Sequence, residues 1–169
     1  MKLILMLAIV AAGLTTTLLA AEPFAPRAAI PTGMEESYLG EGIRQAAIPE
    51  TGQVGIPAYP GAVVIRSYAV TERPPGYTGL PIMELISADD FDTVVAFYKQ
   101  RLSGWGEAEL MSAYYFAEHG NINFFTPEEP HVGVHRLASY FREAEREMLQ
   151  RVLPGGRTLI KVFYSYPPQ

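Results

Sequence analysis

The sequence predicts an α+β domain, a two-layer sandwich with two helices on one face of a mostly antiparallel sheet of about five strands. Two segments carry apolar residues at helical spacing, five others are β-branched, aromatic or alternating, and turns containing glycine or proline separate them. Along the chain these segments follow the order ββαββαβ. Because each helix has one apolar stripe, two helices can cover only one face of such a sheet, and the opposite face is the place to look for function.

The first 57 residues are expected to lie outside the folded domain. Residues 1–21 combine Lys2, an apolar run and Ala20-Ala21, which is typical of a secretory signal peptide. We therefore expect a periplasmic or secreted protein, with an N-terminal membrane anchor only if the signal stays uncleaved. Residues 22–57 are rich in Ala, Gly and Pro and predict an extended leader, and residues 58–169 are expected to form a single domain.

The first two predicted strands precede the clearest helix of the chain. Residues 63–70, VVIRSYAV, are β-branched and aromatic, and residues 81–87 form a second extended run. The loop 73–79 between them is rich in proline and glycine, which disfavour regular structure.

Residues 87–105 predict a capped amphipathic helix. Five apolar residues fall on one helical stripe: Phe91, Val94, Val95, Tyr98 and Leu102. Ser87 is the expected N-cap, and the aspartates at positions 89, 90 and 92 place negative charge on the first turn. We interpret these aspartates as capping residues and not as a catalytic or metal site. Gly104 is expected to end the helix in the left-handed conformation.

Three further elements complete the predicted fold. Residues 109–117 and 121–126 predict a hairpin around the turn at Gly120. Residues 136–152 repeat the helical pattern. Residues 157–166 alternate along a last strand, which Pro167 ends.

The composition excludes several functional classes. The chain contains no cysteine, which excludes a disulfide framework, a thiol nucleophile, a cysteine metal site and a lipid anchor of the bacterial lipoprotein type. The formal net charge is -5, and removal of Lys2 with the signal makes it more negative. Nucleic acid is therefore not an expected partner, because the charge of the whole chain repels its phosphates.

A Y-P-G-A turn at residues 59–62 is followed by F-Y-K-x-x-L at residues 97–102 and by Gly104-Trp105. Together these motifs resemble a group of bacterial exported proteins and lipoproteins of unknown function, over residues 57–105. The motifs are structural, so the resemblance implies an envelope location and an α+β fold and transfers no catalytic residues. The lack of cysteine departs from the lipidated members of the group.

The sheet face away from the helices is the candidate binding surface. Arg66 and Tyr68 on the first strand are expected to share this face with Lys161 and Phe163 on the last strand. Such a surface is more apolar than a monomer usually leaves open. The same residues would also suit packing beneath the leader or a loop. Tyr77, in the proline-rich loop before the second strand, is the other candidate contact.

Our leading hypothesis is a non-enzymatic exported module that binds a protein partner, or a second copy of itself, through this face or the loop 73–79. The alternative is an envelope hydrolase with glutamate and histidine acid–base chemistry, in which several residues would converge in one pocket: Glu84, Glu109, Glu128 or His131. No catalytic residue and no cofactor is assigned. Tyr114 and Tyr115 suit a ligand groove, but we interpret them as strand packing.

His131 and His135 give the most metal-like spacing in the sequence. On an extended strand they would lie about 13 Å apart, which is too far for both to bind one zinc ion. Only a helical turn would bring them together, and Pro130 and Gly133 disfavour such a turn. We therefore expect a loop here, with His135 at the start of the second helix, and no metal site.

Overall fold

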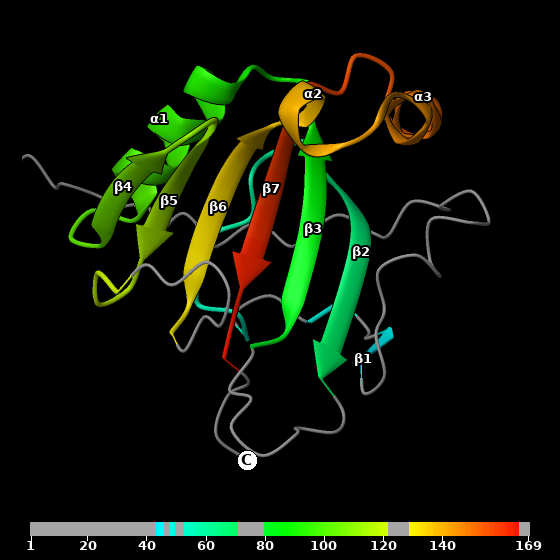
Figure 1. The fold of residues 1–169 in the computed structure, drawn as a ribbon. Helices are drawn as coiled ribbons and strands as arrows, with labels where there is room; N and C mark the ends of the chain where they lie inside the picture. The colour runs from blue at the N-terminus through cyan, green and yellow to red at the C-terminus, as the bar shows by residue number, and fades with distance from the viewer. Residues whose placement is uncertain (1–42, 46–47, 50–52, 71–79, 122–128, 166–169) are drawn as a thin grey trace, which may run out of the picture.

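The computed structural model describes residues 43–45, 48–49, 53–70, 80–121 and 129–165 (Figure 1). The predicted signal, the loop 73–79 with Tyr77, and Glu128 lie outside the described residues, as do most of the leader and residues 122–126 of the predicted hairpin. None of the described helices is long and apolar enough to span a membrane.

The described strands form one antiparallel sheet with helices packed on it, which confirms the predicted α+β class. The strand order is β1-β2-β3-β7-β6-β5-β4. The strands are β1 (Ile43–Gln45), β2 (Val63–Val70), β3 (Ile82–Ser87), β4 (Gly106–Leu110), β5 (Ala113–Ala117), β6 (His131–Arg136) and β7 (Thr158–Phe163). The helices are α1 (Phe91–Arg101), α2 (Leu137–Tyr140) and α3 (Glu143–Val152).

The helices pack on opposite faces of the sheet, so the prediction that they share one face is wrong. Alternate residues of each strand point to opposite faces. One set forms a core with α1: Val64, Met83, Leu85, Phe116, Val132, Val134, Ile160 and Val162. The other set forms a smaller core with α2 and α3: Ile65, Ile86, Leu159, Leu137, Phe141 and Leu149. In Figure 1, α2 and α3 lie at the end of the sheet where β3 ends and β7 begins.

The predicted helix 136–152 divides into α2 and α3. The backbone is extended at Phe141, with φ -105° and ψ 149°, and again at Arg142, with φ -66° and ψ 161°. The break buries Phe141 in the smaller core, whereas Tyr140 at the end of α2 stays partly exposed. The expected single apolar stripe is thus replaced by two short helices joined at a buried aromatic residue.

Two strand predictions are also wrong. Residues 109–117, expected as one strand, divide between β4 and β5 at a tight turn where Met111 has a positive φ of 56°. The segment His131–Arg136, expected as a loop before a helix, forms β6 between β5 and β7. Val132 and Val134 are fully buried on the α1 side, and this burial outweighs the weak strand preference of Gly133.

α1 buries its predicted stripe but begins at a different cap. Its N-cap is Asp90, not Ser87, and the Asp90 carboxylate accepts a hydrogen bond from the Thr93 N–H at 2.8 Å. The Ser87 hydroxyl accepts a bond from the Asp89 N–H at 3.1 Å, just before the helix. The interpretation of the aspartates as capping residues is confirmed at Asp90. Gly104 has a φ of 98°, as predicted for the residue that ends the helix.

β2 contains a β-bulge between Val64 and Arg66. These two residues pair with consecutive residues of β3, so Ile65 is an extra residue in β2. Side chains alternate along a strand, and an extra residue therefore turns Arg66 to the face opposite that of Val64. Arg66 and Tyr68 consequently share the face on which α2 and α3 pack, which we call the α2 face.

Candidate functional site

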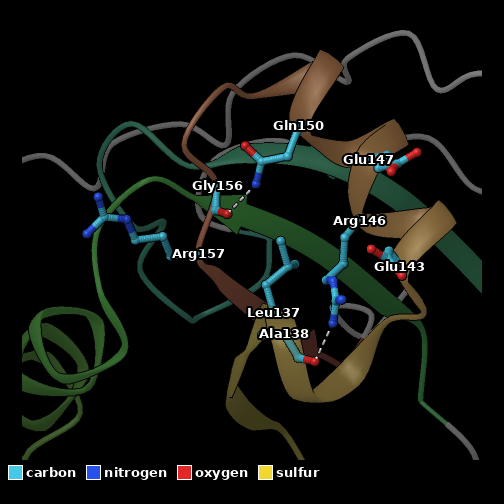
Figure 2. Close-up of a pocket in the computed structure, with 8 residues that line it drawn as sticks. All are labelled: Leu137, Ala138, Glu143, Arg146, Glu147, Gln150, Gly156 and Arg157. Atoms are coloured by element: carbon cyan, nitrogen blue, oxygen red, sulfur yellow. Dashed lines mark hydrogen bonds between the residues drawn. The ribbon is translucent and has the colours of Figure 1, made fainter.

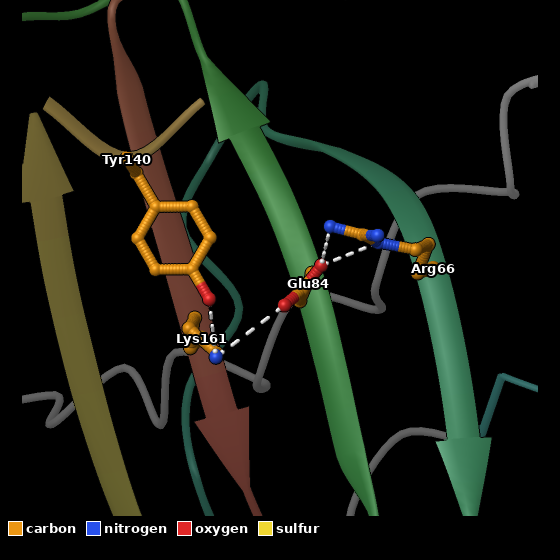
Figure 3. A network of polar contacts seen from close by, with 4 residues as sticks. All are labelled: Arg66, Glu84, Tyr140 and Lys161. Carbon is orange, nitrogen blue, oxygen red and sulfur yellow. Dashed lines mark hydrogen bonds and ion pairs between the residues drawn. The ribbon is translucent and has the colours of Figure 1, made fainter. Parts of the chain in front are cut away.

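One cross-strand row on the α2 face contains a chain of charged side chains. The register aligns six residues across the sheet: Arg66, Glu84, Lys161, Gly133, Tyr115 and Ala108. We call the first three, on β2, β3 and β7, the ion chain. Their side chains lie beside one another in Figure 3, with Tyr140 of α2 above Lys161.

Glu84 is the centre of the ion chain. Its side chain is only 2% exposed, and its carboxylate lies 2.5 Å from both Nε and Nη2 of Arg66. The other carboxylate oxygen lies 3.5 Å from Nζ of Lys161. Lys161 also donates a hydrogen bond to the hydroxyl of Tyr140 at 2.9 Å. A buried carboxylate is tolerated only when its charge is compensated, and here two cations compensate it.

The ion chain has one positive charge in excess, because it contains two cations and one carboxylate. Burial disfavours the Lys161 ammonium, but the adjacent Glu84 carboxylate raises the pKa of Lys161 above its ordinary value. Lys161 is therefore protonated at neutral pH. Its side chain is 16% exposed, so it is the member through which the ion chain meets solvent. This local positive charge contrasts with the formal charge of -5 for the chain.

Two buried histidines of β6 flank the charged row. His131 stacks on Phe163 with 3.9 Å between ring centroids, and its Nδ1 lies 3.2 Å from the Glu129 carbonyl oxygen. His135 packs edge to face against Tyr115 and Tyr140. Burial, and then the positive charge of Lys161, lower the pKa of each histidine to about 4. Both rings are therefore neutral at pH 7.

Nε2 of His135 is buried and has no hydrogen-bond partner among the described residues. The ring leans back over Gly133, because a Cβ atom at residue 133 would lie only 2.9 Å from this nitrogen and 3.1 Å from the Tyr115 ring. Glycine is thus the residue that allows the imidazole and the phenol to approach the strand backbone. Buried polar atoms are nearly always hydrogen-bonded, so an unpaired ring nitrogen is a notable exception.

Gly133→Ala is expected to destabilise the domain by about 1–3 kcal/mol, because the new methyl group displaces the His135 ring from a packed site. Urea unfolding measures the loss. In a His135→Ala background the same substitution should cost clearly less, since the nearest colliding atom is gone. Equal losses in the two backgrounds would show that the collision with His135 is not the cause.

The structure brings four of the five predicted binding residues to the α2 face. Arg66 and Phe163 are buried, while Tyr68 and Lys161 are half-buried. Burial, followed by the Glu84 carboxylate, raises the pKa of the Tyr68 hydroxyl. Tyr77, the fifth residue, lies outside the described residues. Among the described residues of this face, the accessible part therefore centres on Lys161, Tyr68 and Tyr140.

The residues of the hydrolase alternative do not converge among the described residues. Glu84 faces the α2 side, whereas Glu109 pairs with Tyr114 and faces the α1 side of the edge strand β4. His131 is buried against Phe163. His131 and His135 share one face of a strand, and no cluster of three possible metal ligands occurs in the part of the chain that the structure describes.

A cavity of about 390 Å³ lies between α2, α3 and the start of β7 (Figure 2). Two of its polar side chains bond the backbone. Arg146 donates to the Ala138 carbonyl at 2.8 Å, and Gln150 bonds both the Gly156 carbonyl and the Gly155 N–H at 2.8 Å.

Sequence reasoning missed the partners of Lys161. Tyr140 falls inside the predicted helix 136–152, and His135 is predicted at the start of that helix. The alternation H-V-G-V-H was the available signal, since it places both histidines on one face of a strand and both valines on the other.

Comparisons of the chain with protein-family models, curated proteins and solved structures find no match.

Proposed function

We propose that the chain is a binding module and not an enzyme, and that it binds an acidic segment of a protein partner on the α2 face around Lys161. The observation that carries this proposal is the excess positive charge of the ion chain, which meets solvent at Lys161 in a chain of net charge -5. Opposite charge steers a partner to such a site and fixes its register. The predicted signal favours a periplasmic or secreted location for this binding.

The surroundings of Lys161 suit a protein partner. Tyr68 is half-buried on the same face, and Tyr140 is 39% exposed beside the ammonium group. Tyrosine offers an apolar ring with a polar tip, and it is enriched in protein interfaces for this reason. A cation beside the Tyr140 and Phe163 rings fits a carboxylate side chain flanked by apolar residues.

The same geometry gives the hydrolase alternative little support. A catalytic carboxylate must reach the substrate and exchange a proton with it. Glu84 is 2% exposed and lies between two cations, and Glu109 lies on the other face. We therefore retain binding as the single proposed function.

In-cell photocrosslinking tests the proposal. A photoreactive amino acid at Ser139, which is exposed on α2, should crosslink the partner in cells that produce the full chain. Lys161→Met should lower the yield of this adduct about tenfold or more, because a charge-assisted hydrogen bond is lost. The variant should still fold, since Arg66 and Glu84 remain as a neutral pair.

Lys99→Met is the matched control, because it removes the same charge from α1 on the opposite face. It should leave the adduct unchanged. The mass of the adduct distinguishes a second copy of the chain from another protein, and peptide mapping should place the crosslink near acidic residues. Equal yields in the two variants, or no adduct at all, would contradict the proposal.

A further inference from the structure

We infer that the site around Lys161 takes a carboxylate group, that the Nε2–H of His135 donates the second hydrogen bond to it, and that this carboxylate displaces the Tyr140 hydroxyl from Lys161. The inference rests on the proposed binding function and specifies the chemical group that is recognised. It assigns to His135 a role other than metal binding, and it assigns a role to Tyr140.

The first observation is the unpaired nitrogen. His135 is 9% exposed, and its Nε2 has no hydrogen-bond partner in the described part of the chain. Its ring packs against Tyr115 and Tyr140. A buried ring nitrogen without a partner is costly, and in the tautomer that carries its proton on Nε2 a ligand oxygen at this position would supply the hydrogen bond that the protein alone lacks.

The second observation is the position of this nitrogen next to Lys161. Gly133 and Lys161 are directly paired across β6 and β7. Cβ positions of such a pair lie about 4.5–5.5 Å apart. Because Nε2 of His135 lies 2.9 Å from the Cβ position of residue 133, the imidazole and the lysine side chain are neighbours above the sheet. Two oxygens of one carboxylate suit an ammonium and a ring N–H at this spacing.

The third observation is that one side chain covers both groups. Tyr140 accepts the hydrogen bond from Lys161 at 2.9 Å, and its ring lies 5.1 Å from the His135 ring. Tyr140 is the last residue of the four-residue helix α2 and is 39% exposed, so its side chain can rotate towards solvent without moving the core. A carboxylate is a stronger acceptor for an ammonium group than a neutral phenol is.

The charge of the site favours a singly charged anion. Arg66 and Glu84 neutralise each other at close range, which leaves one positive charge at Lys161. Lysine acts as a point charge, whereas phosphate sites usually add a bidentate arginine or several backbone N–H groups. A carboxylate therefore matches the site better than a phosphate does.

NMR titration of the full ¹⁵N-labelled chain at pH 7 tests the inference. Sodium acetate, added at constant ionic strength against sodium chloride, should shift the signals of His135 Nε2 and Lys161 Nζ in a saturable way. The His131 ring, whose Nδ1 lies beside the Glu129 carbonyl oxygen, should shift little. Inorganic phosphate is the second arm and should bind more weakly; tighter binding of phosphate than of acetate would overturn the carboxylate assignment.

Tyr140→Phe tests the displacement step. Removing the competing hydroxyl should tighten acetate binding about two- to tenfold, which is the range expected for one hydrogen bond. Tyr114→Phe is the matched control, since the Tyr114 hydroxyl donates to Glu107 at 2.5 Å on the other face, and it should leave the affinity unchanged. An unchanged or weaker affinity in Tyr140→Phe would overturn the displacement.

The two proposals fail in different ways. If the Lys161-dependent adduct forms in cells but acetate leaves His135 unshifted, the role of His135 is wrong and the binding function stands. If no Lys161-dependent adduct forms, the binding function itself is wrong.

Discussion

Glu84→Gln is expected to destabilise the domain by about 3–5 kcal/mol, because it leaves two cations in a buried site without their counter-charge. Glutamine keeps the size of the side chain, so the loss reports on charge and not on packing. Urea unfolding of the wild-type and variant chains, with the slope of the transition compared, measures the effect.

Glu107→Gln provides the control for this substitution. Glu107 also pairs with a lysine, Lys99, at 3.7 Å, but its side chain is 38% exposed. Removing the Glu107 charge should therefore destabilise the domain far less than Glu84→Gln does, since water hydrates the charges that remain. Lys161→Met added to Glu84→Gln should restore part of the stability, because it removes one of the two unpaired cations. Similar losses for Glu84→Gln and Glu107→Gln would contradict a dominant role for buried charge.

The second large effect expected is a loss of stability in mild acid. The folded-state pKa of His131 and of His135 is lowered to about 4 by burial and by Lys161, against 6.5 for an unperturbed histidine. As the pH falls below 6.5, the unfolded chain binds protons that the folded chain does not. Stability is therefore fully present above pH 6.5 and declines towards pH 4, by up to about 1.4 kcal/mol per pH unit for each histidine.

Unfolding free energies measured between pH 4 and pH 8 test this expectation. Carboxylates also titrate near the lower limit, so the histidine contribution is the difference between the wild-type chain and His131→Phe/His135→Phe. This variant should show a markedly flatter curve between pH 6.5 and pH 4. Parallel curves for wild type and the double variant would contradict the assignment.

The spacing of apolar residues within a segment predicted those elements whose own sequence has a regular period. β2, α1 and β7 each have a clear period, and the apolar stripe from Phe91 to Leu102 is buried as expected. The same periodicity does not determine on which face of the sheet a helix packs. That choice depends on the strand order, which pairs β7 with β3 and β6, far away in sequence.

The candidate site was predicted only in part for the same reason. Arg66 and Lys161 share one face, as alternation along β2 and β7 predicts, but α2 and α3 pack on this face, which was expected to be free of helices. The hydrolase alternative includes Glu84 as a candidate catalytic residue. The position of Glu84 between two cations follows from the cross-strand register, which the pattern of its own strand does not reveal. Tyr140 reaches Lys161 only because the chain breaks at Phe141, and that break depends on the burial of Phe141 in the smaller core.

The bulge in β2 has a consequence for how homologous chains can differ in length. Because Val64 and Arg66 already pair with consecutive residues of β3, loss of the one extra residue at position 65 would leave Arg66 beside Glu84 and every other β2 side chain on its present face. Only the Ile65 side chain would be lost, from the smaller core. A single-codon deletion at this point would thus remove one side chain, whereas the same deletion elsewhere in β2 would move the side chains on one side of it to the other face.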